Sequence, residues 1–343
     1  MLNFEKHYDS FDGLRLGAAA LVLWTHHFAL TKSDIPFSGP LRVNYGIVGV
    51  YVFFAISGYL NALSLDRRRS VPGFLSARAV RIYPALIVCV LTTIALGAVV
   101  SKVSLAEYFF SKDTLKYGVY NSTMFRGFMV FELPGVFEGN PLPSVVNGSL
   151  WTLPMEAMIY ILFAVAMSAF TFRSETSIGL FVVAVVALII ADTIQGPFRE
   201  TGGAFLKFAV VFLAGSSIAA LSKRGLWVAL GHVVAVGLIL VLLPWSAMAG
   251  WLILLAALVI CVGSIRPPDL LRPRFDISYG FYLYAFPIQQ AAVQFFGDFG
   301  TSLMIAVLAT VIVATLSCFL IEQPSRDFFR SVTRRPVESV AST

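Results

Sequence analysis

Residues 12–28 read Asp12-Gly-Leu-Arg15-Leu-Gly-Ala-Ala-Ala-Leu-Val-Leu-Trp-Thr-His26-His27-Phe28, an apolar segment with an arginine at its entrance and two histidines deep inside it. On a helix, eleven residues turn through about 1,100°, so Arg15 and His26 share one face and lie roughly 16 Å apart. That is about half the thickness of the hydrocarbon layer, so with Arg15 at one membrane surface His26 would lie near mid-bilayer. An ionisable group there either serves function or bonds a neighbouring helix. Both interpretations stay open.

The composition indicates an integral membrane protein. Of the 343 residues, 58% are hydrophobic and 13% are charged, about half the charged fraction of a soluble globular protein. The net charge of +6 is typical of lysines and arginines in cytoplasmic loops, and we expect no nucleic-acid binding. Cys89, Cys261 and Cys318 lie in apolar stretches without the spacing of metal ligands, so we expect core packing and no metal.

The hydropathy pattern predicts an all-α fold, a polytopic bundle of about ten transmembrane helices. Each apolar segment is close to the length that a helix needs to cross the bilayer. The first, second, fourth and ninth segments carry more polar residues than the others, so we expect them to line the interior of the bundle. The predicted spans are residues 13–31, 45–64, 80–101, 150–171, 177–194, 204–221, 226–244, 247–265, 277–297 and 302–321.

The distribution of basic residues predicts the orientation. With both termini on one side of the membrane, seventeen of the 25 lysines and arginines fall on that side, which by the positive-inside rule is the cytoplasm. No cleavable signal peptide is visible, so the first span should stay in the membrane. We expect residues 1–336 to form one membrane domain and residues 337–343 a disordered tail. The long external loop 102–149 is typical of a functional segment.

Basic residues gather after the second span. Arg78 and Arg81 lie three apart, on one face at the start of the predicted third helix. Guanidinium groups there could hold a phosphorylated ligand, although a basic loop alone often reflects only topology. Upstream, Ser57-Gly58 is typical of close helix packing. The other residues of this basic region are Arg67, Arg68, Arg69 and Tyr83.

The fourth span carries a carboxylate inside the membrane. It opens with Ser149-Leu-Trp151-Thr-Leu-Pro-Met-Glu156 and continues to Tyr160 on the same face as Glu156. Glu156 would lie about 9 Å below the interface, so it should be paired or protonated, with a histidine or an arginine of the first span as its natural partner. A His–carboxylate pair could form a general base for a hydroxyl group, or it could be a purely structural bond between helices.

The last two spans add polar groups. Hydroxyl and amide side chains are frequent in residues 278–290. Pro287 should kink this helix and free backbone groups that a cavity or a neighbour must satisfy. Glu322 and Arg326 are four residues apart and would form an ion pair at the inner surface, where the pair could serve only to cap the helix. The sequence lacks the Gly-x-Ser-x-Gly elbow, the glycine-rich phosphate loop and the His-Glu-x-x-His pattern of well-known soluble enzymes.

Six motifs together resemble the acyltransferase-3 family of membrane-bound O-acyltransferases, whose members acylate surface glycans. Each motif is weak alone, but they occur in the family's order and cover nearly the whole chain. They are Asp12-Gly-Leu-Arg15 with His26 eleven residues later, Phe53-Phe54-Ala-Ile-Ser57-Gly58, Arg78-x-x-Arg81-Ile-Tyr83-Pro84, Ser149-Leu-Trp151-Thr-Leu-Pro-Met-Glu156, Ser278-Tyr279-Gly-x-Tyr282 and Glu322-Gln-Pro-Ser-Arg326.

The resemblance implies a ten-helix bundle that accepts an acyl group, usually acetyl, from cytoplasmic acyl-CoA and delivers it to a glycan hydroxyl at the outer face. The family's functional positions fall on Arg15 and His26, on the basic pair Arg78 and Arg81, and on Glu156.

Two departures from the family pattern matter. Ala285 stands where many members have a histidine, so that position cannot supply a second base. The hydrolase-like C-terminal domain of other members has no counterpart in these residues. We therefore expect acceptor choice to come from the bundle and the loop 102–149.

We predict an acyl-CoA-dependent O-acyltransferase of a bacterial inner membrane, acting by direct transfer or through an acyl-enzyme. His26 would be the general base, Glu156 would orient or charge it, and Arg15 would steady the donor or a helix contact. The CoA would dock among Arg67, Arg68, Arg69, Arg78, Arg81 and Tyr83. A glycan or lipid-linked glycan acceptor would meet Ser149, Trp151, Tyr160 and Tyr282. The alternatives are a transporter or flippase of a lipid-linked glycan, and another multi-span acyltransferase type with a membrane-embedded histidine.

Overall fold

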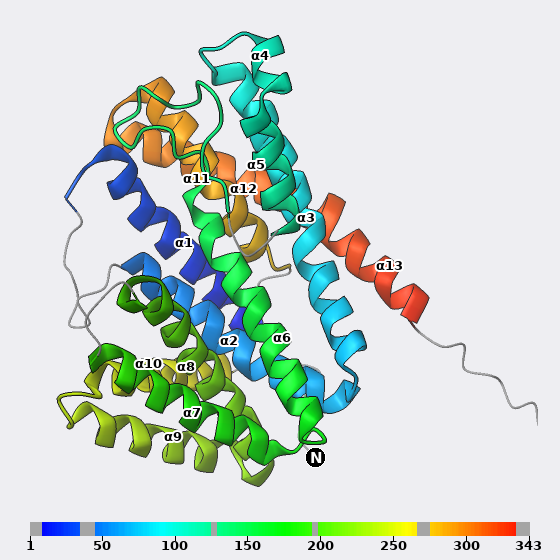
Figure 1. Cartoon of the computed structure of the whole chain (residues 1–343), viewed down its shortest axis with the longest axis vertical. Coiled ribbons are helices and arrows are strands. Elements are labelled where there is room, and N and C mark those ends of the chain that lie inside the picture. The colour runs from blue at the N-terminus through cyan, green and yellow to red at the C-terminus, as the bar shows by residue number, and fades with distance from the viewer. Residues whose placement is uncertain (1–8, 35–44, 125–128, 194–197, 266–274, 334–343) are drawn as a thin grey trace, which may run out of the picture.

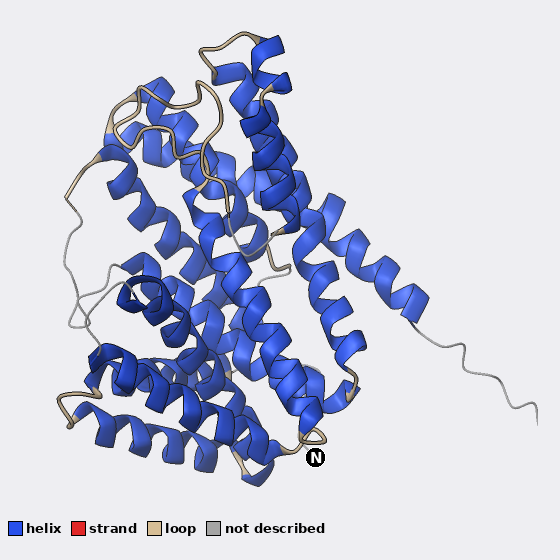
Figure 2. Ribbon diagram, in the orientation of Figure 1, coloured by secondary structure: helices blue, strands red, loops and turns tan. Residues whose placement is uncertain are grey.

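A computed structural model describes residues 9–34, 45–124, 129–193, 198–265 and 275–333. Throughout these residues the chain is helical or irregular, without a strand (Figures 1 and 2). Each of the ten predicted segments is a helix. Their bounds are α1 Asp9–Thr31, α2 Tyr45–Arg68, α3 Val71–Val100, α6 Leu153–Ala169, α7 Ser174–Thr193, α8 Phe198–Leu221, α9 Leu226–Val241, α10 Ala247–Gly263, α11 Ser278–Phe296 and α12 Phe299–Ser317.

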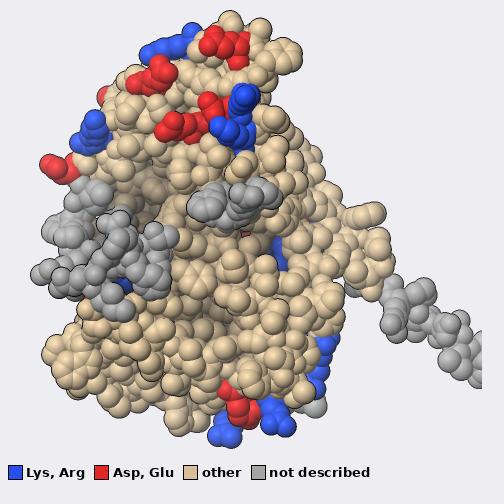
Figure 3. All heavy atoms as spheres, viewed as in Figure 1, with Lys and Arg blue, Asp and Glu red and all other residues tan. Residues whose placement is uncertain are grey.

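The helices define a multi-pass membrane protein. Among the described residues, six helical segments are long and apolar enough to cross a bilayer, and α9 and α10 are apolar but shorter. The first and ninth predicted spans are not among the six, because α1 and α11 carry the polar side chains of the interior. Figure 3 shows charged side chains mostly toward the rim of the view and few on the broad middle of that face. The six segments are Tyr45–Arg68, Val71–Val100, Gly148–Ala169, Ser174–Thr193, Gly203–Arg224 and Phe299–Thr333.

Small residues let α2 and α8 cross closely in the middle of the bundle. A Cβ atom on Gly58 would collide with the backbone of Phe212, and a Cβ on Gly215 would collide with the carbonyl of Ala55. Gly58 therefore acts in packing, as the sequence predicts, because only a residue without a side chain allows this backbone approach.

The third helix begins nine residues earlier than predicted. The Ser70 hydroxyl accepts from the Gly73 N–H at 3.2 Å and caps the helix, which starts at Val71. A serine before a proline-containing first turn is a helix-start signal, and the hydropathy pattern alone passes over it. Arg78 and Arg81 consequently lie two and three turns inside α3 instead of at its start.

The segment predicted as a long external loop has structure of its own. Its described residues contain two short helices, α4 Leu105–Phe110 and α5 Lys112–Thr123. The Tyr108 hydroxyl donates to the carbonyl of Ile94 on α3 at 2.8 Å. We call the end of the bundle that carries residues 102–149 the loop end. Because α3 starts just after the arginines that end α2 and rises about 45 Å over its 30 residues, those arginines lie at the opposite end.

The end of α11 is tied to the same segment. Pro287 leaves the carbonyl of Leu283 without its helical partner, and the Asn147 side-chain amide donates to that carbonyl at 3.0 Å. Asn140 Nδ2 donates to the side-chain oxygen of Gln290 at 2.6 Å. The prediction that a neighbour satisfies the freed backbone group is confirmed.

The chain leaves α12 through a π-helical turn, Cys318–Glu322, and continues as α13, Gln323–Thr333. Glu322 turns inward, where its carboxylate accepts from the Ser317 hydroxyl at 3.2 Å. On α13 the aromatic ring of Phe328 is exposed, whereas Arg326 and Arg330 line a cavity.

Candidate active site

A large polar cavity opens among α1, α2, α3, α13 and the residues before α11. Its volume is about 620 Å³. Three carboxylates, those of Asp12, Asp276 and Asp327, also lie in its wall, so the arginines outnumber the carboxylates seven to three. We call it the arginine cavity. Its seven arginines are Arg15, Arg67, Arg68, Arg78, Arg81, Arg326 and Arg330.

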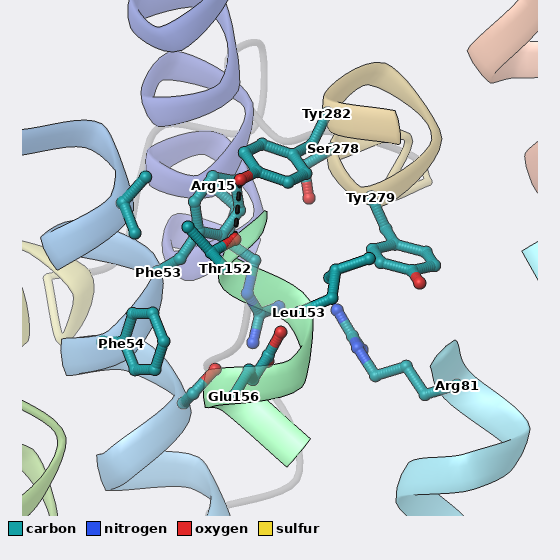
Figure 4. Close-up of a pocket in the computed structure, with 12 residues that line it drawn as sticks. Arg15, Phe53, Phe54, Arg81, Thr152, Leu153, Glu156, Ser278, Tyr279 and Tyr282 are labelled. Carbon is teal, nitrogen blue, oxygen red and sulfur yellow. Dashed lines mark hydrogen bonds between the residues drawn. The ribbon is translucent and has the colours of Figure 1, made fainter. Parts of the chain in front are cut away.

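A smaller cavity of about 60 Å³ adjoins the first, and we call it the inner cavity. Arg15, Ser57 and Arg81 line both cavities. Figure 4 shows the side chains converging from α1, α2, α3, the start of α6 and α11. The prediction that the first, second, fourth and ninth segments line the interior is therefore confirmed. The other lining residues are Val50, Phe53, Phe54, Thr152, Leu153, Glu156, Ser278, Tyr279 and Tyr282.

One carboxylate holds two of the arginines in place. Asp276 Oδ2 lies 3.5 Å from Arg15 Nη1 and 3.3 Å from Arg81 Nη2. Its other oxygen accepts from the backbone and hydroxyl of Ser278 at 3.0 and 2.5 Å. Burial alone would raise the pKa of the Asp276 carboxyl, but the Arg81 and Arg15 guanidiniums and the Ser278 bonds outweigh burial and place that pKa below its ordinary value.

Glu156 lies among these guanidinium groups. In Figure 4 its carboxylate points into the space between Arg15 and Arg81. It accepts a short hydrogen bond from the hydroxyl of Tyr160, which is also 3.2 Å from the hydroxyl of Ser57. Of the two kinds of partner that the sequence left open for Glu156, the structure places the arginine of α1 beside it.

Aromatic side chains close the inner cavity toward the loop end. The Tyr282 hydroxyl lies 2.7 Å from Thr152 Oγ1, the dashed line in Figure 4, and 2.8 Å from the carbonyl oxygen of Ser149. The ring of Phe53 packs against that of Tyr282, with centroids 5.8 Å apart. With these contacts the tyrosine lies across the end of the cavity.

The two histidines of α1 have different surroundings. His27 is fully buried, and its Nε2 lies 3.1 Å from both the Phe299 carbonyl oxygen and the Ser302 hydroxyl. His27 therefore joins α1 to α12. His26 packs edge-on against Phe286, with centroids 5.2 Å apart, and its buried Nδ1 has no hydrogen-bond partner.

His26 is outside the walls of both the arginine and the inner cavity. Phe286 follows Tyr282 by one turn of α11, so the imidazole lies beyond the aromatic closure.

A third cavity, of about 320 Å³, opens at the loop end. We call it the loop cavity. Asn140 and Phe137 of the 102–149 segment line it, together with Val293 and Gln294 of α11. One side of α11 thus runs from Ser278 at the inner cavity, past the Phe286–His26 contact, to the loop cavity, about 24 Å along its axis.

The predicted residues divide as follows. Arg15, Arg81, Glu156 and Tyr282 meet in the inner cavity, and Arg67, Arg68, Arg78 and Tyr160 line the arginine cavity. Arg69 and Tyr83 line neither. Ser149 is buried, and its hydroxyl donates to Asn147 Oδ1. Trp151 packs against Phe208 of α8.

Sequence reasoning missed several residues of the site. Asp276 is the most important, and its signal is an acid two residues before the start of the hydroxyl-rich α11. Thr152 and Asn61 gave no signal beyond being polar in an apolar span. Arg330 lies on the same face of α13 as Arg326, and this spacing of four residues could have predicted that both arginines contribute to one site.

This architecture defines a class, a multi-pass membrane protein with a cationic cavity that narrows onto a half-buried carboxylate. Residues 8–323 match the model of the acyltransferase-3 family, described as an acyltransferase domain. The chain belongs to this family and is a membrane acyltransferase. That membership decides between the enzyme and the transporter interpretations in favour of the enzyme.

Two relatives match over nearly their whole length. The O-acetyl transferase of Shigella phage Sf6 is 29% identical over 328 residues, 92% of this chain and 95% of the relative. Nodulation protein 10 of Rhizobium leguminosarum bv. viciae is 29% identical over 362 residues, 96% of each chain. No solved structure is significantly similar to the chain.

Proposed function

We propose that the protein moves an acetyl group from acetyl-CoA to a hydroxyl of a surface or lipid-linked glycan, across a bacterial inner membrane with both termini in the cytoplasm. The single observation that carries this proposal is the arginine cavity, whose cations lead to the narrow, buried inner cavity. Guanidinium forks suit phosphates, and CoA carries its phosphates far from its thioester. The name of the phage relative, an O-acetyl transferase, supports acetyl as the acyl group.

The donor would lie with its phosphates among Arg67, Arg68 and Arg78 and its thioester in the inner cavity. Arg15 and Glu156 would position the acyl end there. This role for Glu156 differs from orienting His26, because its hydrogen bond comes from Tyr160.

In this proposal His26 is the general base. It removes the proton from the acceptor hydroxyl, whose oxygen bonds to the thioester carbonyl carbon as the C–S bond breaks. The CoA thiolate then takes up the proton that His26 carries. Its Nδ1 has no partner, which leaves it available for this work.

The acceptor would enter from the loop cavity, where amide groups such as Asn140 and the ring of Phe137 suit a sugar. For acyl group and hydroxyl to meet, Tyr282 and Phe286 must turn aside. Their position between the cavities keeps water from the thioester when no acceptor is bound.

The test is acyl transfer by purified protein in detergent or proteoliposomes, with radiolabelled acetyl-CoA and surface glycan from the host. His26→Gln should lower the transfer rate by at least a hundredfold, because positioned bases contribute about 10²–10⁴-fold. His232→Gln is the matched control, since His232 is exposed on α9. Undiminished transfer by His26→Gln would remove His26 from the mechanism, and absence of label from any glycan would remove the acceptor class.

A further inference from the structure

Asn61 is an unpartnered amide in the wall of the arginine cavity. It lies on α2 and is 1% exposed, and neither its Nδ2 nor its Oδ1 has a hydrogen-bond partner. Arg78 Nε, in the same wall, is also buried without a partner. Buried polar groups are nearly always hydrogen-bonded, so two unpartnered groups in one cavity point to a ligand that supplies their partners.

The position of Asn61 says which part of a ligand it would meet. Ser57, which lines both cavities, lies one turn of α2 before Asn61, about 6 Å along the axis. Arg67 and Arg68 lie roughly 10 Å beyond Asn61. Asn61 therefore stands between the narrow end, where a thioester would sit, and the cations, where phosphates would sit.

The chemistry of a carboxamide narrows the ligand group further. Asn61 offers two N–H donors and one carbonyl acceptor, without charge. Its partner must both accept and donate. Acyl-CoA carries two secondary amides in its pantetheine arm, between thioester and phosphates, and they offer a carbonyl and an N–H within reach of one side chain.

We propose that Asn61 binds the amides of the pantetheine arm, donating from Nδ2 to one carbonyl and accepting an N–H at Oδ1. This assignment rests on the proposed CoA-dependent function. With this role, Asn61 distinguishes a pantetheine thioester from other anionic ligands of the arginines. A ligand with phosphates but no pantetheine amides would make no hydrogen bond to Asn61.

The experiment measures binding to purified protein by calorimetry with three probes: acetyl-CoA, S-acetyl-pantetheine and adenosine 3′,5′-bisphosphate. Asn61→Leu, which is close in shape, should raise the Kd of acetyl-CoA about tenfold, the loss of roughly one to two net hydrogen bonds. The Kd of S-acetyl-pantetheine should rise by the same factor, and that of the bisphosphate should stay unchanged. Asn61→Ala, which cannot block the cavity, should behave in the same way.

The unliganded protein gives a second readout. Because Asn61 has no partner to lose, Asn61→Leu should unfold at the wild-type temperature or higher, while the stabilisation by saturating acetyl-CoA becomes smaller. A fall in the melting temperature without ligand would mean that Asn61 has a structural partner and would overturn the proposal.

The outcomes separate the two proposals. If the wild-type protein binds none of the probes, the CoA-dependent function fails. If it binds acetyl-CoA and both Asn61 variants bind equally well, only the role of Asn61 fails. An equal loss for the bisphosphate would place Asn61 at the nucleotide half and would overturn its assignment to the arm.

Discussion

Asp276 shows how a single side chain organises the cationic site. One of its oxygens is shared by the guanidiniums of α1 and α3, and the other is held by Ser278 at the start of α11. Without a shared anion, Arg15 and Arg81 would repel each other at the neck between the cavities. The carboxylate therefore joins three helices, and Arg15 Nη1 also donates to Asp12 Oδ1 at 2.9 Å within α1.

Replacing Asp276 with asparagine should destabilise the protein and change its response to acid. We expect a loss of about 1–3 kcal/mol at neutral pH, less than for a sealed pair because both arginines face an open cavity. Since the pKa of Asp276 is lowered by folding, its contribution is complete above the unfolded pKa of about 3.9 and is lost as the pH falls through the folded pKa.

The measurement is the melting temperature in detergent from pH 8 to pH 3. The difference between wild type and Asp276→Asn should be constant above about pH 5, should begin to shrink near pH 4 and should disappear only below the folded pKa of Asp276. A difference that does not vary with pH would show that Asp276 does not act through its charge. Asp113→Asn, an exposed pair with Lys116, is the control and should change little.

At the scale of a single element, α11 depends on residues far away in the chain. Pro287 removes one of its internal hydrogen bonds, and Asn147 replaces that bond while its Oδ1 accepts from the backbone and hydroxyl of Ser149. The start of α6 is thereby fixed against α11 near Tyr282. Pro287 leaves a backbone carbonyl of α11 without its helical donor, and Asn147, from the segment at the loop end, supplies a donor in its place.

Asn147→Ala should therefore lower stability much more than its size suggests. The variant leaves the Leu283 carbonyl with only the weak donor of the Cys89 thiol at 3.4 Å and the Ser149 amide without its side-chain partner. An unsatisfied buried group costs about 1–3 kcal/mol. The check is the melting temperature in detergent, with Lys116→Ala in the same segment as control, since Lys116 is exposed. Equal melting temperatures for Asn147→Ala and wild type would contradict this account.

At the scale of the whole molecule, two accessible ends face each other across an aromatic barrier. The inner cavity ends at Phe53 and Tyr282, and the Phe286 ring lies against His26 one turn further along α11. In the proposed reaction this barrier separates a thioester from water at the loop end. How well the barrier excludes water should then decide how fast acetyl-CoA is hydrolysed in the absence of an acceptor.

Replacing Phe286 with a smaller residue tests whether the aromatic barrier limits hydrolysis of the donor. Phe286→Leu should raise the hydrolysis of acetyl-CoA without acceptor several-fold, because water reaches the thioester and His26 more easily. Release of free CoA thiol is the readout, and Leu320→Ala, an exposed side chain on the π-helical turn, is the control. Hydrolysis at the wild-type rate by a folded Phe286→Leu protein would mean that Phe286 does not separate the two ends.

The sequence predicted the helices and the interior-facing spans because both depend on apolar periodicity and on the cost of burying charge. It identified Arg15 and Glu156 for the second reason, and Arg81 because it forms a basic pair with Arg78 on one helix face. It could not place Asp276 beside them, since that contact joins residues 261 positions apart. It also gave no means to see that the ring of His26 lies beyond Tyr282, because the direction of an imidazole depends on the packing of neighbouring helices.

The small volume of the inner cavity has a consequence for the choice of donor. A space of about 60 Å³ holds roughly four water molecules, which is comparable to a two-carbon acyl group. A fatty acyl chain would have to displace the rings of Phe53 and Phe54, which pack against Tyr282 and Phe208. The size of the inner cavity would thus select the donor by acyl-chain length: short acyl thioesters would fit, and the long acyl thioesters of lipid synthesis would not.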